Sequence, residues 1–210
     1  DNLGPVITDV RHDPLRPGTD NVVSVHARVF DSDGIGSVTA FSGTASTRVE
    51  FSSTELFADG QHGDGLPGDG HFAGQIGNFQ GRVVFYVEAP DTPGKVGRYP
   101  VDPSRRTNPS ILSEATIENL DRSFCVYRHE NAQGGAHPSY RFWIDQDAER
   151  YLNARQLHSN DLVEGSFLFA NEELYYTSRV RFSGSPWARQ RWSESYRVSM
   201  AKDKPLHGVI

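Results

Sequence analysis

Three aspartates recur at a five-residue spacing in one glycine-rich stretch, at Asp59, Asp64 and Asp69, and a glycine follows each of them. Clustered carboxylates on a flexible backbone supply the oxygen ligands that Ca²⁺ prefers. The spacing differs from that of an EF-hand loop, in which acidic residues stand two apart and a glutamate closes the loop. Two interpretations stay open: a calcium site, or a series of Asp-Gly turns whose carboxylates accept hydrogen bonds from amides of the same loop.

A second acidic turn, Asp31-Ser32-Asp33-Gly34, comes earlier in the chain. It is either an ordinary connection between strands or a further part of a calcium site. His62 and His71 lie in or beside the Asp-Gly stretch. Zinc needs more nitrogen or sulfur ligands than this stretch offers, so both histidines are expected to be solvated.

Two arginines flank a turn of small residues near the end of the chain, Ser183-Gly184-Ser185. Arg181 lies in the strand-like run before this turn, and Arg197 lies in the run after it. Because arginine can bind phosphate oxygens in a bidentate way, Arg181, Gly184, Ser185 and Arg197 are predicted to hold a phosphate group. The alternative is that both arginines form surface ion pairs, worth about 0–1 kcal/mol each, with nearby glutamates: Glu172, Glu173 or Glu194.

The composition excludes some classes of function. The chain has 210 residues and a formal net charge of −6, so general affinity for nucleic acid is not expected. No apolar run approaches the roughly 20 residues that cross a bilayer. The single cysteine, Cys125, stands in an apolar run and is predicted to be a buried thiol. The start at Asp1 and the apolar end at Ile210 suggest a piece of a longer protein, which we expect to be extracellular or on a cell surface.

Short β-branched and aromatic runs, separated by Gly, Asp and Pro, predict strands in the first half of the chain. Alternation of apolar and polar residues is clearest in residues 22–30 and 82–89. Several such strands without a convincing helix predict an antiparallel β-sandwich of immunoglobulin-like size, which we assign to residues 1–104. The predicted strands are residues 6–10, 22–30, 37–42, 48–53, 71–76 and 82–89.

A proline-rich stretch at residues 90–109 predicts a boundary or an extended connector, because proline removes amide donors and fixes φ. The second domain is assigned to residues 105–210. Residues 140–157 carry an amphipathic pattern that predicts a helix. Further strands are predicted at residues 123–129, 166–170, 174–182 and 196–200, and residues 111–119 fit either a helix or a strand.

The first hundred residues resemble the immunoglobulin-like modules of large bacterial surface and secreted proteins. The resemblance rests on the phrases Pro-Val-Ile-Thr-Asp-Val, Val-Phe-Asp-Ser-Asp-Gly-Ile-Gly-Ser-Val and Val-Val-Phe-Tyr-Val-Glu-Ala-Pro-Asp, and on the Asp-Gly stretch. In such modules the stretch usually begins with two aspartates, whereas Ala58 precedes Asp59 here. The resemblance implies a spacer or binding module.

Residues 139–208 resemble the beginning of the spore coat protein H (CotH) kinase-like domain, on four segments: 165–176, 179–187, 195–200 and 206–208. The resemblance implies a partial α+β kinase-like N-terminal lobe, ATP with magnesium or manganese as cofactor, and a protein substrate. The family commonly has Arg where Ser183 stands and a Lys-rich approach where Glu194 stands. No acidic residue follows Asp203 to serve as metal ligand or base, so this part alone is expected to be inactive.

A non-enzymatic protein is the alternative. In that interpretation the chain is a calcium-dependent adhesion or carbohydrate-binding protein, its partner is a cell-surface component, and Trp187 and Trp192 stack on sugar rings. A serine hydrolase is not indicated, because the chain has no Gly-x-Ser-x-Gly motif.

Overall fold

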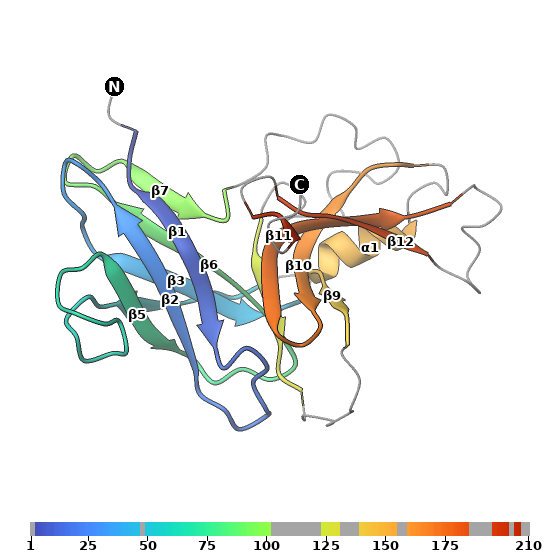
Figure 1. Cartoon of the computed structure of the whole chain (residues 1–210), viewed down its shortest axis with the longest axis horizontal. Coiled ribbons are helices and arrows are strands. Elements are labelled where there is room, and N and C mark those ends of the chain that lie inside the picture. Colours follow the sequence, from blue (N-terminus) through green and yellow to red (C-terminus); the bar gives the residue numbers. More distant parts are fainter. Residues whose placement is uncertain are drawn as a thin grey trace.

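Strands make up about half of the described residues in the computed structural model, which describes residues 3–46, 49–101, 123–130, 139–154, 159–184, 195–201 and 204–206. The described part forms three antiparallel sheets and one α-helix. Figure 1 shows the strands of the first half beside the sheet and helix of the second half. The prediction of a mainly β protein is therefore confirmed. Within the described residues, no helix combines the length and apolar character needed to span a bilayer.

The first sheet has the order β1-β2-β5. It consists of β1 (Val6–Asp13), β2 (Val23–Phe30) and β5 (His71–Ile76). Alternate residues of β2 are buried while their neighbours are partly exposed, as the apolar and polar alternation predicts. One face of this sheet therefore belongs to the core, and the other carries mostly polar side chains, with Val6 and Phe30 as exposed apolar exceptions.

The second sheet has the order β4-β3-β6-β7. It consists of β3 (Val38–Thr44), β4 (Ser52–Leu56), β6 (Arg82–Pro90) and β7 (Val96–Tyr99). β6 lies inside the sheet, and Val83 to Val87 are buried on both of its faces. The inward side chains of the two sheets form one core, with these members from β2, β3 and β6 among others: Val25, Val29, Val38, Ala40, Phe85 and Val87.

A strand from the second half completes the second sheet. β8 (Cys125–Arg128) pairs with Arg82–Phe85 of β6, while β7 pairs with Val87–Pro90 of the same strand. Both partners bond to the edge of β6 that faces away from β3, so β7 and β8 lie end to end along it. The predicted boundary after residue 104 lies outside the described residues and stays a prediction, but hydrogen bonding crosses it.

The third sheet has the order β12-β11-β10-β9. It consists of β9 (Arg141–Trp143), β10 (Val163–Phe169), β11 (Glu173–Phe182) and β12 (Tyr196–Ser199). Helix α1 (Gln146–Ala154) begins at Asp145, whose carboxylate accepts hydrogen bonds from the amides of residues 147 and 148, both at 2.9 Å. The buried face of α1 packs on one end of the sheet through Ala148, Tyr151, Leu152, Val163 and Val180.

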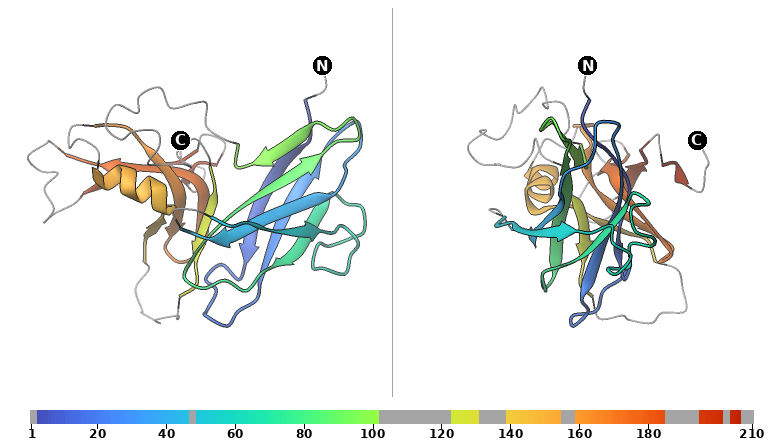
Figure 2. Two further views of the ribbon diagram at one scale, coloured as in Figure 1. Left: turned by 180° about the vertical axis from the view of Figure 1, so that it is seen from behind. Right: turned by 90° about the vertical axis from the view of Figure 1, so that its left-hand side faces the viewer.

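The other end of the third sheet packs on the first half, and Figure 2 shows this arrangement in two views. Trp143, Leu168, Leu174 and Tyr176 belong to the same core as the first two sheets. The buried Ser166 hydroxyl of β10 accepts a hydrogen bond from the Val126 amide of β8 at 2.9 Å. Arg82 of β6 reaches α1, where its Nη1 lies 2.6 Å from a carboxylate oxygen of Glu149. The two halves are thus joined by apolar packing and by polar contacts.

The bounds of several elements differ from the sequence predictions; β1 ends three residues later than predicted, and β10 begins three residues earlier. The predicted helix at residues 140–157 begins with β9, because its aromatic residues pair with β10, and only Gln146–Ala154 is helical within the described part. β7 lies in the proline-rich stretch, where prolines flank four residues that are free of them. β4 ends at Leu56, further along than predicted. The segment 111–119 lies outside the described residues.

Candidate functional site

The hairpin of β11 and β12 brings the two predicted phosphate-binding arginines together. In the register of this pair, Arg181 stands directly opposite Arg197, next to the pair formed by Phe182 and Tyr196. The Ser183 amide donates a hydrogen bond to the Ser195 carbonyl oxygen at 2.7 Å, which extends the ladder by one step. Gly184 follows at a φ of 93°, a left-handed conformation that suits glycine and ends the strand. Ser185 lies outside the described residues.

Like charges at opposed positions of an antiparallel pair repel each other. Arg181 Nη1 donates to the Asn160 side-chain oxygen at 2.7 Å and to the Phe182 carbonyl oxygen at 3.2 Å, and both acceptors are neutral. In the described part of the chain, no carboxylate lies within ion-pair distance of Arg181 or Arg197. The predicted ion pairs with Glu172 or Glu173 are therefore not formed, and Glu194 lies outside the described residues. Among the described residues, the end of this hairpin therefore carries two positive charges without an acidic partner.

A third arginine, on the same strand as Arg181, does have an acidic partner. Arg179, two positions before Arg181 on β11, stands opposite Ser199 rather than another arginine. Its Nε lies 3.4 Å from a carboxylate oxygen of Glu164 on β10. Arg179 thus has an acidic partner, whereas the two opposed arginines have none in the part of the chain that the structure describes.

The Asp-Gly loop, residues 58–70, directs its carboxylates onto its own backbone. Asp64 is buried and accepts hydrogen bonds from the amides of Gly60 at 2.8 Å and His62 at 3.0 Å. The hydrogen bond from Gly60 is the main cause that lowers the pKa of Asp64 below its ordinary value. The loop therefore forms turns of the kind that the second interpretation of the sequence describes.

The two outer aspartates of the loop act in the same way. The Asp59 carboxylate lies 3.0 Å from the His62 ring and accepts the Gln61 amide at 2.9 Å. Asp69 accepts the His71 amide at 2.9 Å and the Leu66 amide at 3.2 Å. The pKa of Asp59 is lowered chiefly by the His62 side chain, and that of Asp69 chiefly by the His71 amide. Asp59, Asp64 and Asp69 do not come together as a group with metal-ligand spacing.

A different set of carboxylates does come together. Asp31 and Asp33 follow β2, and Asp91 follows β6; one oxygen of each lies within 4.8 Å of the others. The bridge between Ile35 and Asp91 brings the two segments side by side. Asp91 is buried and accepts the Lys95 amide at 2.5 Å. The sequence pointed to Asp31 and Asp33 as an acidic turn that is either an ordinary connection or a further part of a calcium site, and it gave no signal for Asp91, which stands in the proline-rich stretch.

Sequence reasoning also missed a buried polar cluster between the halves. His12 of β1 is buried, stacks on the Tyr127 ring at a centroid distance of 4.3 Å and is hydrogen-bonded to the Tyr176 hydroxyl of β11. Burial lowers the pKa of His12 to about 3, His129 nearby adds to this effect, and a backbone contact with Leu15 opposes it. His12 is therefore neutral at neutral pH and contacts residues of both halves.

The chain was compared with models of protein families and with curated proteins, and neither comparison gives a match.

Proposed function

We propose that the chain is an immunoglobulin-like β-sandwich followed by the N-terminal part of a CotH-type kinase-like domain, in which the β11–β12 hairpin binds the phosphates of ATP. The observation that carries the proposal is the pairing of Arg181 with Arg197, without a carboxylate partner among the described residues, beside a left-handed glycine. A phosphate group between the two guanidinium groups would replace repulsion by charge-assisted hydrogen bonds. The sequence resemblance to the CotH kinase-like domain supports the proposal, because Arg181 and Arg197 lie in two of the segments that carry it, 179–187 and 195–200.

The remaining parts of the proposal follow from the resemblance. Magnesium or manganese would offset the charge of the phosphates, and the acceptor would be a hydroxyl of a protein substrate. The third sheet with α1 on one end supports an α+β lobe, and the two packed sheets of the first half support a spacer or binding module. We expect the protein to be secreted or held at a cell surface.

Nucleotide binding by the full 210-residue chain tests the proposal. We expect ATP with magnesium or manganese to release heat in calorimetry. The double variant Arg181→Ala/Arg197→Ala should weaken binding at least about tenfold, because loss of one charge-assisted hydrogen bond costs about 1.5–3 kcal/mol. Arg179→Ala is the matched control, since it removes an arginine of the same strand that is already paired with Glu164.

Equal affinity of the double variant and the original chain would refute the phosphate site. Kinase activity is a separate question, to be measured as transfer of labelled phosphate by the longest natural chain that contains these residues. ATP binding without transfer by that chain would favour an inactive kinase-like scaffold.

A calcium-dependent adhesion or carbohydrate-binding protein is the second candidate function. The spacing of Asp31, Asp33 and Asp91 favours it, because carboxylate oxygens that are this close suit Ca²⁺. Calorimetry with CaCl₂ should then give heat that Asp33→Asn abolishes and that Asp59→Asn leaves unchanged. Absence of heat from the original chain would reject this candidate.

A further inference from the structure

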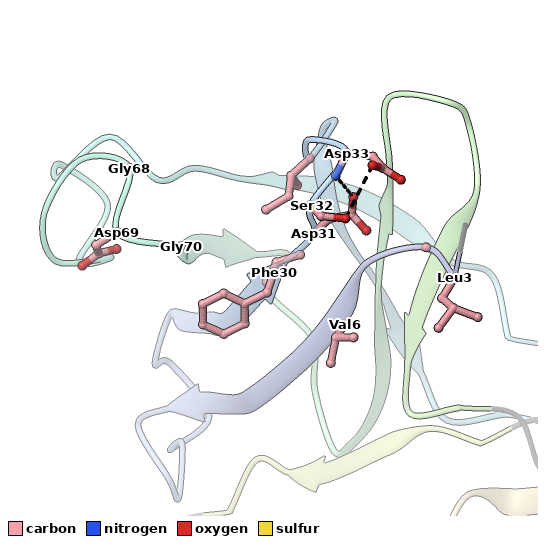
Figure 3. A pocket seen from close by; sticks show the side chains of 12 residues that line it. Leu3, Val6, Phe30, Asp31, Ser32, Asp33, Gly68, Asp69 and Gly70 are labelled. Carbon is pink, nitrogen blue, oxygen red and sulfur yellow. Dashed lines mark hydrogen bonds between the residues drawn. The ribbon is translucent and has the colours of Figure 1, made fainter. Parts of the chain in front are cut away.

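An open hollow of about 620 Å³ lies at one end of the first sheet. Figure 3 shows its labelled residues, with Phe30 in the middle, Val6 and Leu3 on one side and Asp69 on the other. Its walls come from the segment before β1, the end of β2, the acidic turn that follows and the end of the Asp-Gly loop. We call this feature the acidic hollow.

The floor of the acidic hollow is apolar and exposed. Leu3 is 87% exposed, Val6 58% and Phe30 45%. Val6 and Phe30 are opposed in the β1–β2 register, so their side chains stand side by side on the face of the sheet that points away from the core. Neighbouring exposed apolar side chains around a concavity indicate a surface that another molecule covers.

The rim of the acidic hollow is negative. Asp31, Asp33 and Asp69 line it, and no lysine or arginine is among its lining residues. In the described part of the chain, neither Asp31 nor Asp33 has a basic side chain within ion-pair distance. The side-chain oxygen of Asp31 accepts the Asp33 amide at 2.7 Å, which fixes the turn at the rim. Bound anions, nucleic acid and acidic lipid surfaces would all be repelled.

The Phe30 ring already packs against a cation of its own strand. The Arg28 guanidinium lies over the ring, 4.7 Å from its centroid, and Arg28 is not part of the wall of the hollow. An incoming side chain with a cationic head group and an apolar stem therefore finds an apolar floor and the carboxylates of the acidic turn within one site.

We propose that the acidic hollow docks a segment of a partner protein in which a lysine or arginine stands next to an apolar side chain. The aliphatic stem and the apolar neighbour lie on Val6, Leu3 and Phe30. The charged head group reaches Asp31 and Asp33. This interaction surface is separate from the arginine hairpin and does not depend on ATP binding.

The test follows backbone amide signals of the isotopically labelled full chain by NMR, in EDTA so that divalent metals are absent. The probe is the capped peptide Val-Lys-Val-Lys-Val, and the same peptide with Glu in place of Lys is its counterpart. We expect the lysine peptide to shift the signals of Val6, Phe30 and Asp33 with an affinity at least about fivefold higher than that of the glutamate peptide, a difference of about 1 kcal/mol.

Variants assign the binding to the hollow. Asp31→Asn/Asp33→Asn keeps the side-chain oxygen that accepts the Asp33 amide and removes both charges, so binding should fall severalfold and lose its salt dependence. Val6→Ser should also weaken binding. Val22→Ser is its matched control, because Val22 is 56% exposed but lies outside the hollow. Glu55→Gln, on β4, is the control for lost charge.

Three results would overturn the proposal. Equal binding of the two peptides would show that the rim does not select a cation. Signals of the hollow that move only after calcium replaces EDTA would assign the carboxylates to a metal. Shifts that follow protein concentration without any peptide would show that a second copy of this chain covers the hollow.

Discussion

Acidification should destabilise the protein through His12. The pKa of His12 is lowered from 6.5 to about 3 in the folded state. Between these values the unfolded chain binds a proton and the folded chain does not, so the free energy of unfolding falls as the pH falls. The full difference corresponds to about 5 kcal/mol, of which about 2.5 kcal/mol should be lost between about pH 7.5 and about pH 4.5. This loss is a large part of the 5–15 kcal/mol that stabilises a typical domain.

The assay is urea unfolding at a series of pH values, followed by tryptophan fluorescence. In His12→Gln the side chain cannot titrate but can still hydrogen-bond the Tyr176 hydroxyl, so the variant should show a shallower fall in this pH range. The slope is the readout, since the variant is expected to lose some stability at every pH. His71→Gln is the control, because His71 lies outside the buried cluster. The aspartates of the Asp-Gly loop, whose pKa values are lowered from 3.8, act at lower pH and do not interfere.

A His12→Gln variant with the same slope as the original chain would refute this reasoning. If the variant does not fold, the NMR titration of the His12 ring in the original chain decides the question. The ring should remain neutral at about pH 5 while the protein is folded. A ring that protonates there without unfolding would show that His12 is not held neutral by burial.

Three further predictions concern packing inside the protein. Ser166→Ala should lower the free energy of unfolding by about 1–3 kcal/mol, measured in urea, because it leaves the buried Val126 amide without its acceptor. Gly97→Ala should lower the melting temperature, since the added Cβ would lie 2.0 Å from the Pro5 carbonyl oxygen and would force β7 away from the start of β1. The Cys125 thiol, whose pKa is raised by burial, should react with a thiol reagent only after urea unfolds the chain; reaction in the folded state would contradict its burial.

Local patterns predicted much of the fold. Residues 71–76 and 82–89 were predicted as strands, and β5 and β6 begin at the same residues, because short β-branched and aromatic runs bounded by Gly, Asp and Pro are a local signal. β9 was not predicted, since its three residues are a strand only through their pairing with β10. The end-to-end arrangement of β7 and β8 also depends on pairing between segments that are distant in the chain. The periodicity of apolar residues carries no information on such pairing.

Some residues of the candidate sites could be predicted from the sequence, and others could not. The sequence named Arg181 and Arg197, and the register of β11 and β12 places them opposite each other. The sequence also offered the Asp-Gly turns as one of two interpretations of Asp59, Asp64 and Asp69. Asp91 and His12 carried no local signal: each gains its neighbours from segments distant in the chain.

Because β7 and β8 share one edge of β6, this edge limits which segment of the chain could be transferred to another protein as a stable unit. A gene fusion that carried only residues 1–104 would leave Arg82–Phe85 with an open strand edge, ready to pair with another chain. A recombination event that keeps β8 with the first half transfers a closed edge instead. A segment that recombination transfers as a stable unit should therefore extend past the proline-rich stretch to residue 128 at least. Substitutions in the third sheet would have to stay compatible with the surface of the first half on which that sheet packs.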